Sequence, residues 1–387
     1  MTQRRGQVLS ASFLGFLILI LLGAVWIAGQ AETAILESQA GEVTEFSSDP
    51  TAPGFRAFTT ATDTALILHT AVSPGAGAEL VGASLLTGAD DNAGGSVVSI
   101  PRTFVDAEQT GLTLADLFAV SGLDAVVAEL SGTMQIGFGD VVVLDSSSWT
   151  SLMADDLPLA LTLRDDLVRS LDGSDLPTAP TEVVLERGTR EFALNDIATI
   201  AGHRNPGEPA LGVALRQQQI WRAWISRIAS GDDRPEVFAQ PGGFASLIGD
   251  LANAEVSFRT VATSTLPATS PAETMYLADN ETILDLTAQI VPFPEPSSVV
   301  DRPSVLLLDT TFGAQNQLST VSAITRAGGA VTVLGNTDGV ETLPLEVQLH
   351  DPAADAVAQE IAERLGYGPP RSVAVDDATT AITVVVG

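Results

Sequence analysis

The chain has 387 residues and a formal charge of −30, and all 18 of its basic residues are arginine. The absence of lysine excludes a Walker lysine and a Schiff-base lysine, and the absence of cysteine excludes disulfides, thiolate metal sites and cysteine nucleophiles. Three widely separated histidines make a histidine-rich metal site improbable, and so acidic a chain would repel nucleic acid. The length is enough for two modest domains.

An uncharged apolar stretch lies near the N-terminus. Two arginines precede residues 8–28, which match the roughly 20 apolar residues that span a bilayer. These arginines, and Trp26 near the far end, predict a transmembrane helix with residues 1–7 in the cytoplasm. A cleaved signal peptide is the alternative. We therefore expect a single-pass protein of the bacterial cell membrane whose body is extracytoplasmic.

The exterior begins with a polar segment, residues 29–62, which we interpret as a tether. Residues 63–290 then alternate between strand-like and helical patterns, which predicts an α/β domain. Expected strands are 65–72, 79–86, 96–101, 140–145 and 157–163; expected helices are two short ones within 113–134, broken at Gly122, and an amphipathic one over 213–229. The core face of that last helix is predicted to carry Ile220, Trp221, Trp224, Ile225 and Ile228.

A second module follows a proline-rich linker, residues 291–303. Residues 304–387 predict a small α/β domain with strands at 304–309, 330–336, 346–351 and 382–387, and helices within 315–329 and 355–366. This module has few arginines and many acids, so it does not look like a polyanion-binding module.

Three short motifs follow one another along the chain, and their order carries a family resemblance. They are Ser99-Ile100-Pro101-Arg102, Gly202-His203-Arg204 and Arg216-Gln217-Gln218. The first resembles the SIPRD strand end, the second the R-x-R and the third the RQQ helix start of the LytR-CpsA-Psr family. Those membrane-anchored proteins transfer glycopolymers from a polyprenyl-pyrophosphate carrier to the bacterial cell wall, and the C-terminal module resembles the family's LytR C-terminal domain.

The resemblance implies an LCP-like mixed-sheet domain with flanking helices, followed by the small C-terminal α/β domain. It also implies that phosphate or pyrophosphate is bound by the matching residues, which are Arg102, Arg204, Arg216, Gln217 and Gln218. The alternative for Arg102 and Arg216 is that they are buried, ion-paired structural residues. In the family the domain core encloses the polyprenyl tail, so an apolar tunnel is a further hypothesis for this chain.

The departures from the family pattern concern its chemistry. Val81 stands where the family has an aspartate that helps to hold magnesium, and Thr103 replaces the aspartate after the SIPR sequence. Gly202 replaces the first arginine of R-x-R, while Ala210 and Val213 stand at a further aspartate and arginine. We therefore assign no catalytic residue and no metal ligand, and expect magnesium only if the chain is an active transferase.

Acidic doublets could in principle replace the lost metal site. They occur at 90–91, 155–156, 165–166, 232–233 and 376–377. Adjacent side chains rarely converge on one ion, and 48 acids give several doublets by composition alone.

The leading interpretation is thus a membrane-anchored, catalytically degenerate LCP-like protein. It would bind an envelope glycopolymer, its polyprenyl carrier or another family member. One alternative is an active phosphotransferase that attaches glycopolymers from polyprenyl pyrophosphate to the cell wall. The other is an adaptor that binds an envelope protein through its C-terminal domain.

Overall fold

The computed structural model describes residues 49–73, 77–89, 94–153, 158–231, 243–266, 274–313, 317–337, 344–374 and 379–387. The chain divides into two compact units, Met1–Asp49 and Pro50–Gly387, and every described helix and strand belongs to the second. The predicted transmembrane helix, 8–28, lies outside the described residues. Within the described ranges, no helix combines the length and the apolar character that crossing a bilayer needs.

A five-stranded mixed sheet forms the centre of the larger domain. Its strand order is β11-β4-β3-β2-β6, with β2–β3 and β3–β4 antiparallel and β4–β11 and β2–β6 parallel. The strands are β2 (Thr64–Ser73), β3 (Gly77–Gly88), β4 (Gly95–Pro101), β6 (Asp140–Leu144) and β11 (Val256–Thr260). The first four correspond to predicted strands, and the predicted mixed α/β character is confirmed.

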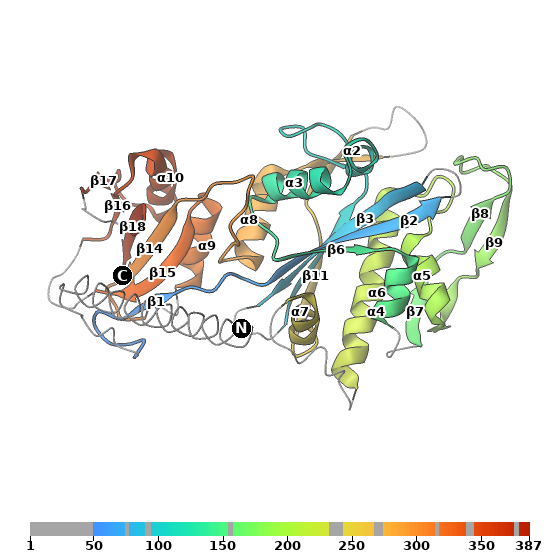
Figure 1. Ribbon diagram of the computed structural model, residues 1–387, viewed down its shortest axis with the longest axis horizontal. Coiled ribbons are helices and arrows are strands. Elements are labelled where there is room, and N and C mark those ends of the chain that lie inside the picture. The colour runs from blue at the N-terminus through green and yellow to red at the C-terminus, as the bar shows by residue number, and fades with distance from the viewer. Residues whose placement is uncertain are drawn as a thin grey trace, which may run out of the picture. The chain divides into compact units, whose positions relative to one another are not determined.

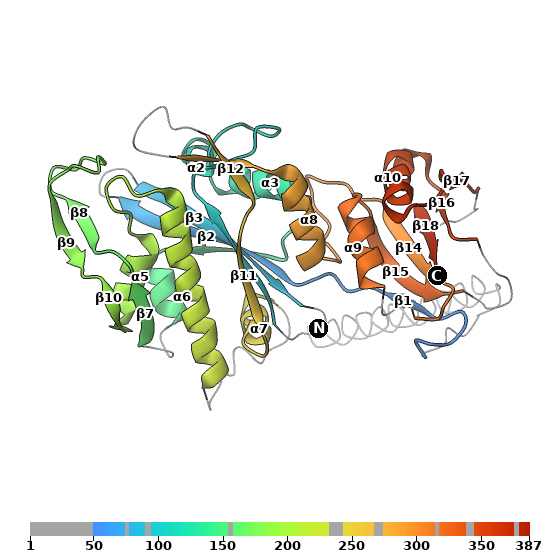
Figure 2. The ribbon, with the colours of Figure 1, turned by 180° about the vertical axis from the view of Figure 1, so that it is seen from behind.

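Helices cover both faces of this sheet because both faces of its strands are apolar. Ala65 and Ile67 point into one core and Leu66 and Leu68 into the other, as the alternation of side chains along a strand requires. The first core is closed by α4 (Ser146–Leu152), α5 (Leu194–Gly202), α6 (Ala210–Ser230) and α7 (Gly243–Leu251). The second is closed by α2 (Leu114–Ser121), α3 (Leu123–Met134) and α8 (Asn280–Ile290) (Figures 1 and 2).

The predicted pair of short helices is confirmed, with its break at Gly122. This residue has φ +82°, a left-handed value that favours glycine. The N-cap of α2 is Thr113, whose side-chain oxygen accepts a hydrogen bond from the Asp116 amide at 3.1 Å. The chain therefore ends one helix and starts the next within a single residue.

Smaller sheets complete the described part of the larger domain. Strand β7 (Leu159–Leu163) pairs with β10 (Gly188–Phe192), and β8 (Leu167–Ser170) pairs with β9 (Thr181–Leu185), both antiparallel. Strand β13 (Met275–Ala278) lies between β12 (Thr263–Leu266) and β5 (Phe104–Val105). Of these strands, only β7 was predicted.

The C-terminal module is built on a six-stranded sheet of order β1-β15-β14-β18-β16-β17. The helices α9 (Leu318–Arg326) and α10 (Asp355–Leu365) pack on it and enclose a separate apolar core; a 3-10 turn, η4, spans Pro352–Ala354. Its strands are β14 (Ser304–Asp309), β15 (Ala330–Asn336), β16 (Glu346–Leu349), β17 (Arg371–Ser372) and β18 (Ile382–Val386). All the strands and helices predicted for this module are present.

The remaining strand of that sheet, β1 (Arg56–Phe58), comes from the opposite end of the sequence. It pairs antiparallel with β15, and the side chain of Asn336 donates to the Pro50 and Ala52 carbonyls at 2.8 and 2.9 Å. The range predicted as a tether, 29–62, thus contains a strand of the C-terminal sheet. The chain reaches the central sheet of the larger domain only after leaving the C-terminal one.

Candidate functional site

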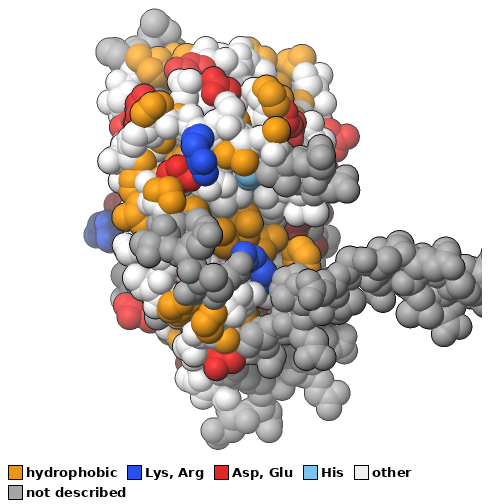
Figure 3. Space-filling model, turned by 90° about the vertical axis from the view of Figure 1, so that its left-hand side faces the viewer, with side chains coloured by type: hydrophobic (Ala, Val, Ile, Leu, Met, Phe, Trp, Pro, Cys, Tyr) orange, Lys and Arg blue, Asp and Glu red, His pale blue; other side chains and the backbone are white. Residues whose placement is uncertain are grey.

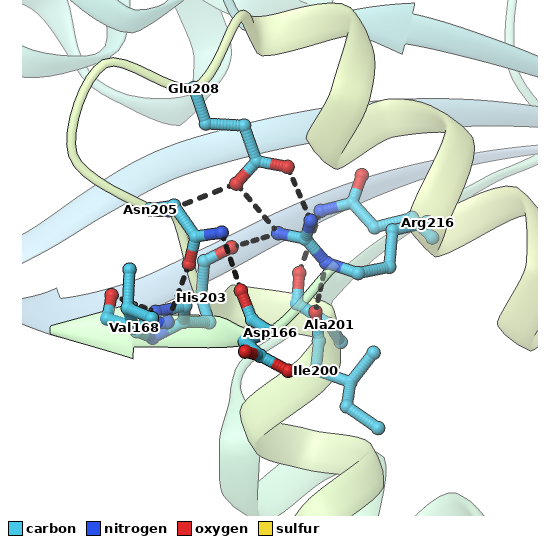
Figure 4. Close-up of polar contacts among 9 residues, drawn as sticks. Asp166, Val168, Ile200, Ala201, His203, Asn205, Glu208 and Arg216 are labelled. Atoms are coloured by element: carbon cyan, nitrogen blue, oxygen red, sulfur yellow. Dashed lines mark hydrogen bonds and ion pairs between the residues drawn. The ribbon is translucent and has the colours of Figure 1, made fainter. Parts of the chain in front are cut away.

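The RQQ motif lies on the second turn of α6, and its first residue binds the end of α5. The Arg216 guanidinium donates to the Ile200 carbonyl at 3.1 Å and to the His203 carbonyl, and it forms an ion pair with Glu208 (Figure 4). The last carbonyls of a helix lack partners within the helix, and a cation there also interacts favourably with the helix dipole. Arg216 therefore caps α5 and, with its side chain 11% exposed, is largely occupied by protein partners.

Gln217 continues the same cap from a fully buried position. Its amide nitrogen donates to the Ala201 carbonyl at 2.9 Å, while its amide oxygen lies against Gly82 of β3. A Cβ at position 82 would stand 2.4 Å from that oxygen, so a larger residue there would require the Gln217 amide to move. Strand β3 bulges beside this contact, because the pairing with β2 skips Val81 between Leu80 and Gly82.

Gln218 connects α6 to the first motif. Its amide nitrogen lies 3.3 Å from the Ser99 hydroxyl and 2.7 Å from the Arg259 carbonyl. The structure therefore brings the SIPR strand and the RQQ helix together. Ser99 is itself fully buried on β4, so Gln218 is the member of this pair that reaches solvent.

The two other predicted arginines follow the ends of α5 and β4. Arg204 follows α5 and forms an ion pair with Asp175 at 2.7 Å. Arg102 follows β4, where its carbonyl accepts from the Ala115 amide at 3.0 Å, and its side chain is half-buried. That phosphate is bound by these five residues stays a prediction; in the structure, Arg204 and Arg216 each hold an acidic partner.

Four of the five positions at which the chain departs from the family pattern are buried, and the fifth, Gly202, is half-buried. Val81, Thr103, Ala210 and Val213 are 0–5% exposed. The Thr103 hydroxyl donates to the Thr274 carbonyl at 2.8 Å, which satisfies it within the protein. Apolar side chains stand at three of these positions, Val81, Ala210 and Val213, where the resemblance would put metal or phosphate ligands.

A cluster of aromatic rings fills the space between the central sheet and α6. Trp149, Trp221 and Trp224 are 0–1% exposed, which confirms the predicted core face of α6. His69 stacks on Trp149 with the ring centroids 5.7 Å apart, and the Trp149 and Trp221 centroids are 5.1 Å apart. Packing of this kind counts against an apolar tunnel at this place.

His69 is the buried titratable group of that cluster. One ring nitrogen, Nε2, lies 3.0 Å from the Ser84 hydroxyl, and complete burial lowers the pKa of the imidazole to about 3. Burial in apolar surroundings disfavours the charged form, so the ring is neutral at every physiological pH. It is a core residue, unsuited to act as a general base.

The opposite side of α6 lines an open cleft of about 460 Å³, within the range of ligand sites. Arg216 and Gln218 of the predicted set line it, together with Arg164 after β7 and Arg222 on α6. Arg222 lies over the Phe258 ring, 4.2 Å from its centroid, and Arg164 has no ion pair within the described ranges. Among the described residues, these two exposed arginines are the cationic groups of the cleft that no carboxylate neutralises.

Sequence reasoning did not single out Arg164 or Arg222. Arg222 could have been found, because helical spacing from Leu215 and Gln218 places it on the same face of α6. Arg164 carries no comparable signal, since it reaches the cleft from the turn after β7. Its contribution depends on tertiary structure alone.

Acidic groups in the described part of the chain form no cluster that could hold a metal ion. Of the acidic doublets, only 165–166 lies within the described ranges, and Asp166 accepts a hydrogen bond from the Arg187 amide at 2.7 Å.

Glu129 has a raised pKa, chiefly because it is buried and partly because Asp106 is near, although hydrogen bonds from Thr110 oppose the shift.

Comparison with known proteins finds similarity in structure. No family model matches the sequence, and no curated protein matches it. Among solved structures, Bacillus subtilis TagT is 15% identical with a TM-score of 0.44, covering 64% of this chain and 93% of that one. Bacillus subtilis TagV is 14% identical with a TM-score of 0.45, covering 59% and 98%.

A third structure is the LytR-CPS2A-psr family protein YwtF (TagT) with bound octaprenyl pyrophosphate lipid. It is 16% identical with a TM-score of 0.43, covering 64% of this chain and 92% of that one. At these identities the likeness concerns the fold alone. All three TM-scores are below 0.5, and one of these similar structures is named as a member of the LytR-CPS2A-psr family, which the sequence motifs resemble.

Proposed function

We propose that this chain is a membrane-anchored, extracytoplasmic binding protein of the bacterial cell envelope, with an LCP-like domain that has lost catalysis. Its ligand is an envelope glycopolymer or the polyprenyl-phosphate carrier of one. The observation that carries the proposal is the cleft beside α6, where arginine and glutamine side chains converge. Guanidinium and amide groups are the donors that phosphate oxygens and sugar hydroxyls need.

The absence of catalysis is supported by the residues at the departures from the family pattern. Transfer of a phosphoryl group requires cations placed where charge develops, and each lost donor costs about 3 to 4 kcal/mol by analogy with oxyanion-hole variants. Val81, Ala210 and Val213 offer no charge, and burial keeps water away from them as well. Binding requires fewer correctly placed side chains than catalysis, because they need only complement the ground state of the ligand and not a transition state.

The acidic C-terminal module is a poor site for an anionic ligand. Figure 3 shows one face of the molecule, on which the basic side chains lie apart from one another. Arg326, Arg364 and Arg371 each hold a carboxylate. This supports binding on the larger domain.

The test is to look for binding without turnover. The full chain in detergent micelles is incubated with a polyprenyl-pyrophosphate-linked glycopolymer, a cell-wall acceptor and magnesium. We expect the donor to be retained on the protein and recovered unchanged. Accumulation of a ligated product at a rate proportional to protein would overturn the loss of catalysis. Failure to retain the donor, or the polymer without its carrier, would overturn the binding proposal and favour the adaptor alternative.

A further inference from the structure

Strand β6 forms an uncovered edge of the central sheet. It is the last strand in the order β11-β4-β3-β2-β6, and within the described ranges no strand pairs with its outer side. In a parallel pair, successive residues direct their N–H and C=O groups alternately toward the partner strand and away from it. Alternate backbone groups of β6 therefore point to the side of the sheet where no further strand lies.

The side chains of β6 do not protect this edge. Val141, Val142 and Val143 are three successive β-branched residues, and Val141 and Val143 are each 40% exposed. Edge strands are commonly protected by proline, lysine or a bulge, because open apolar edges pair with other chains. Residues 141–144 contain no proline and no charge, and their pairing with β2 has no register shift. The edge is therefore suited to pair with an added strand.

An added strand would meet a different surface on each face of the sheet. The register with β2 places Asp140 and Val142 on the face that α7 covers. It places Val141 and Val143 on the opposite face, which α3 covers (Figure 1). Successive side chains of a strand point to opposite faces, so an added strand would direct its side chains alternately toward α3 and toward α7.

On the α3 side, the edge adjoins an apolar hollow of about 310 Å³. Val141 lines this hollow together with Val127 of α3, Phe138 and Val299, and Val299 is 49% exposed. Asp124 is its single charged lining residue in the described part of the chain. Exposed apolar surface of this kind is typical of sites where a partner binds, and the hollow suits an aliphatic side chain.

On the α7 side, the edge adjoins an acidic hollow of about 280 Å³. Asp63, Asp140 and Glu295 line it, and within the described ranges none of the three forms an ion pair. Burial, and then the nearby charge of Asp63, raise the pKa of Asp250 beside this hollow, which indicates an excess of negative charge. The N-terminus of α7, at Gly243, supplies about half a positive charge, which does not balance three carboxylates. The hollow therefore suits a basic side chain.

We propose that the outer edge of β6 binds an extended segment of another protein in which apolar and basic residues alternate. The segment adds a strand to the central sheet through backbone hydrogen bonds, and side chains in the two hollows give the specificity. A second copy of this chain is a poor occupant, because it has a charge of −30 and would bring further carboxylates to the edge. The inference does not rest on the proposed function, since the two hollows share no lining residue with the cleft beside α6.

The experiment measures the fluorescence anisotropy of labelled octapeptides added to the full chain in detergent micelles, with protein-free micelles as the blank. One peptide alternates valine and lysine, and the other has four valines followed by four lysines. We expect the alternating peptide to bind at least tenfold more tightly, because only its strand separates apolar from basic side chains onto opposite faces.

Backbone pairing is tested with two further versions of the alternating peptide. Each is methylated on alternate backbone nitrogens, so that each lacks the N–H donors of one strand edge. Because only one edge of the peptide faces β6, we expect one methylated version to lose binding and the other to bind within threefold of the unmodified peptide.

Two substitutions, each with a matched control, test the side chains. Val141→Lys should weaken binding of the alternating peptide about tenfold, because it removes an apolar contact and repels lysine. Its control is Val184→Lys, at a valine of β9 that is 38% exposed and belongs to a different sheet. Glu295→Gln should weaken binding about threefold, the effect of one exposed charge pair, and its control is Glu363→Gln at an exposed position on α10. Both controls should change Kd less than twofold.

Several results would overturn the inference. Equal affinity for the two unmodified peptides, or equal losses in Val141→Lys and Val184→Lys, would indicate unspecific attraction of cations to an acidic chain. Binding of both methylated versions, or of neither, would exclude pairing through one peptide edge, and absence of binding by the alternating peptide would exclude the site. A dimer in light scattering that Val141→Lys dissociates would assign the edge to a second copy. None of these results involves the glycopolymer, so the proposed function stands or falls by its own test.

Discussion

Arg216 shows how one residue can satisfy a motif and still be structural. Its guanidinium caps the C-terminus of α5 and forms an ion pair with Glu208, and both side chains are less than 15% exposed. We expect Arg216→Gln to lower the free energy of unfolding by about 3 kcal/mol, because it leaves a largely buried carboxylate without its partner. Urea denaturation measures this. The Glu208→Gln variant and the double variant complete a cycle, in which the double should cost less than the sum of the singles.

If Arg216 served to bind ligand and not to stabilise the fold, the urea denaturation of Arg216→Gln would give a different result. The single variant would then unfold like the wild type while losing affinity for a glycerol-phosphate oligomer. Additive costs in the cycle would likewise contradict the assigned ion pair.

His69 gives the chain a defined loss of stability in acid. Its pKa is lowered to about 3 in the folded protein and is about 6.5 when unfolded, so only the unfolded state takes up this proton between those values. Its contribution is complete above about pH 6.5 and is lost as the pH falls toward 3. From pH 7 to pH 5 the loss amounts to about 2 kcal/mol.

The measurement is urea denaturation at pH 7 and pH 5, for the wild type and for His69→Phe. Phenylalanine preserves the ring that stacks on Trp149 but cannot bind a proton. We expect the difference between the two pH values to shrink by about 2 kcal/mol in the variant. An unchanged difference would show that His69 is not the residue responsible.

At the scale of elements, the sequence predicted the helices and strands whose buried residues follow a regular apolar pattern. Strands β14 and β15 have the bounds read from their apolar runs, and the core face of α6 follows from its spacing. The β8–β9 hairpin was missed because β9 is exposed along almost its whole length, so no alternation marks it. For the site, the family resemblance implied five phosphate-binding residues, of which Arg216 and Gln218 line the cleft, but the cleft also contains Arg164, which only tertiary structure brings there.

The contact between α6 and β3 can be tested by substitutions on both elements. Gly82→Ala would put a Cβ 2.4 Å from the amide oxygen of the fully buried Gln217, whose side chain would have to shift and so strain its hydrogen bond to the Ala201 carbonyl. We expect the change to cost about 1 to 3 kcal/mol of unfolding free energy. Adding Gln217→Ala should recover part of this cost by removing the clash. If Gly82→Ala is neutral, or the double variant is less stable than either single one, the two elements do not pack as described.

At the scale of the whole molecule, Arg302 ties the larger domain to the C-terminal module. It donates to the Gln135 carbonyl at 2.8 Å on one side, and to the Thr325 and Gly329 carbonyls at 2.7 and 2.9 Å on the other. Burial lowers its pKa to about 10, which still leaves it charged. The range predicted as a linker, 291–303, therefore includes a buried connection between two cores.

We expect Arg302→Met to remove about 3 kcal/mol of unfolding free energy and to make the two modules unfold in separate steps, because three carbonyls lose their hydrogen-bond donor. Differential scanning calorimetry shows this as a second transition. The control Arg364→Gln breaks only the surface pair with Glu360 and should cost less than about 0.5 kcal/mol. A single transition in Arg302→Met, with wild-type stability, would contradict the connection.

The proposed binder differs from a transferase in one property. It binds an anionic polymer without the metal that transfer chemistry needs. Calorimetric titration of the full chain with a glycerol-phosphate oligomer, once in magnesium and once in EDTA at matched ionic strength, measures this property. We expect the same Kd in both conditions, and loss of binding in Arg222→Gln. Binding that appears only with magnesium would contradict the proposal and revive the transferase.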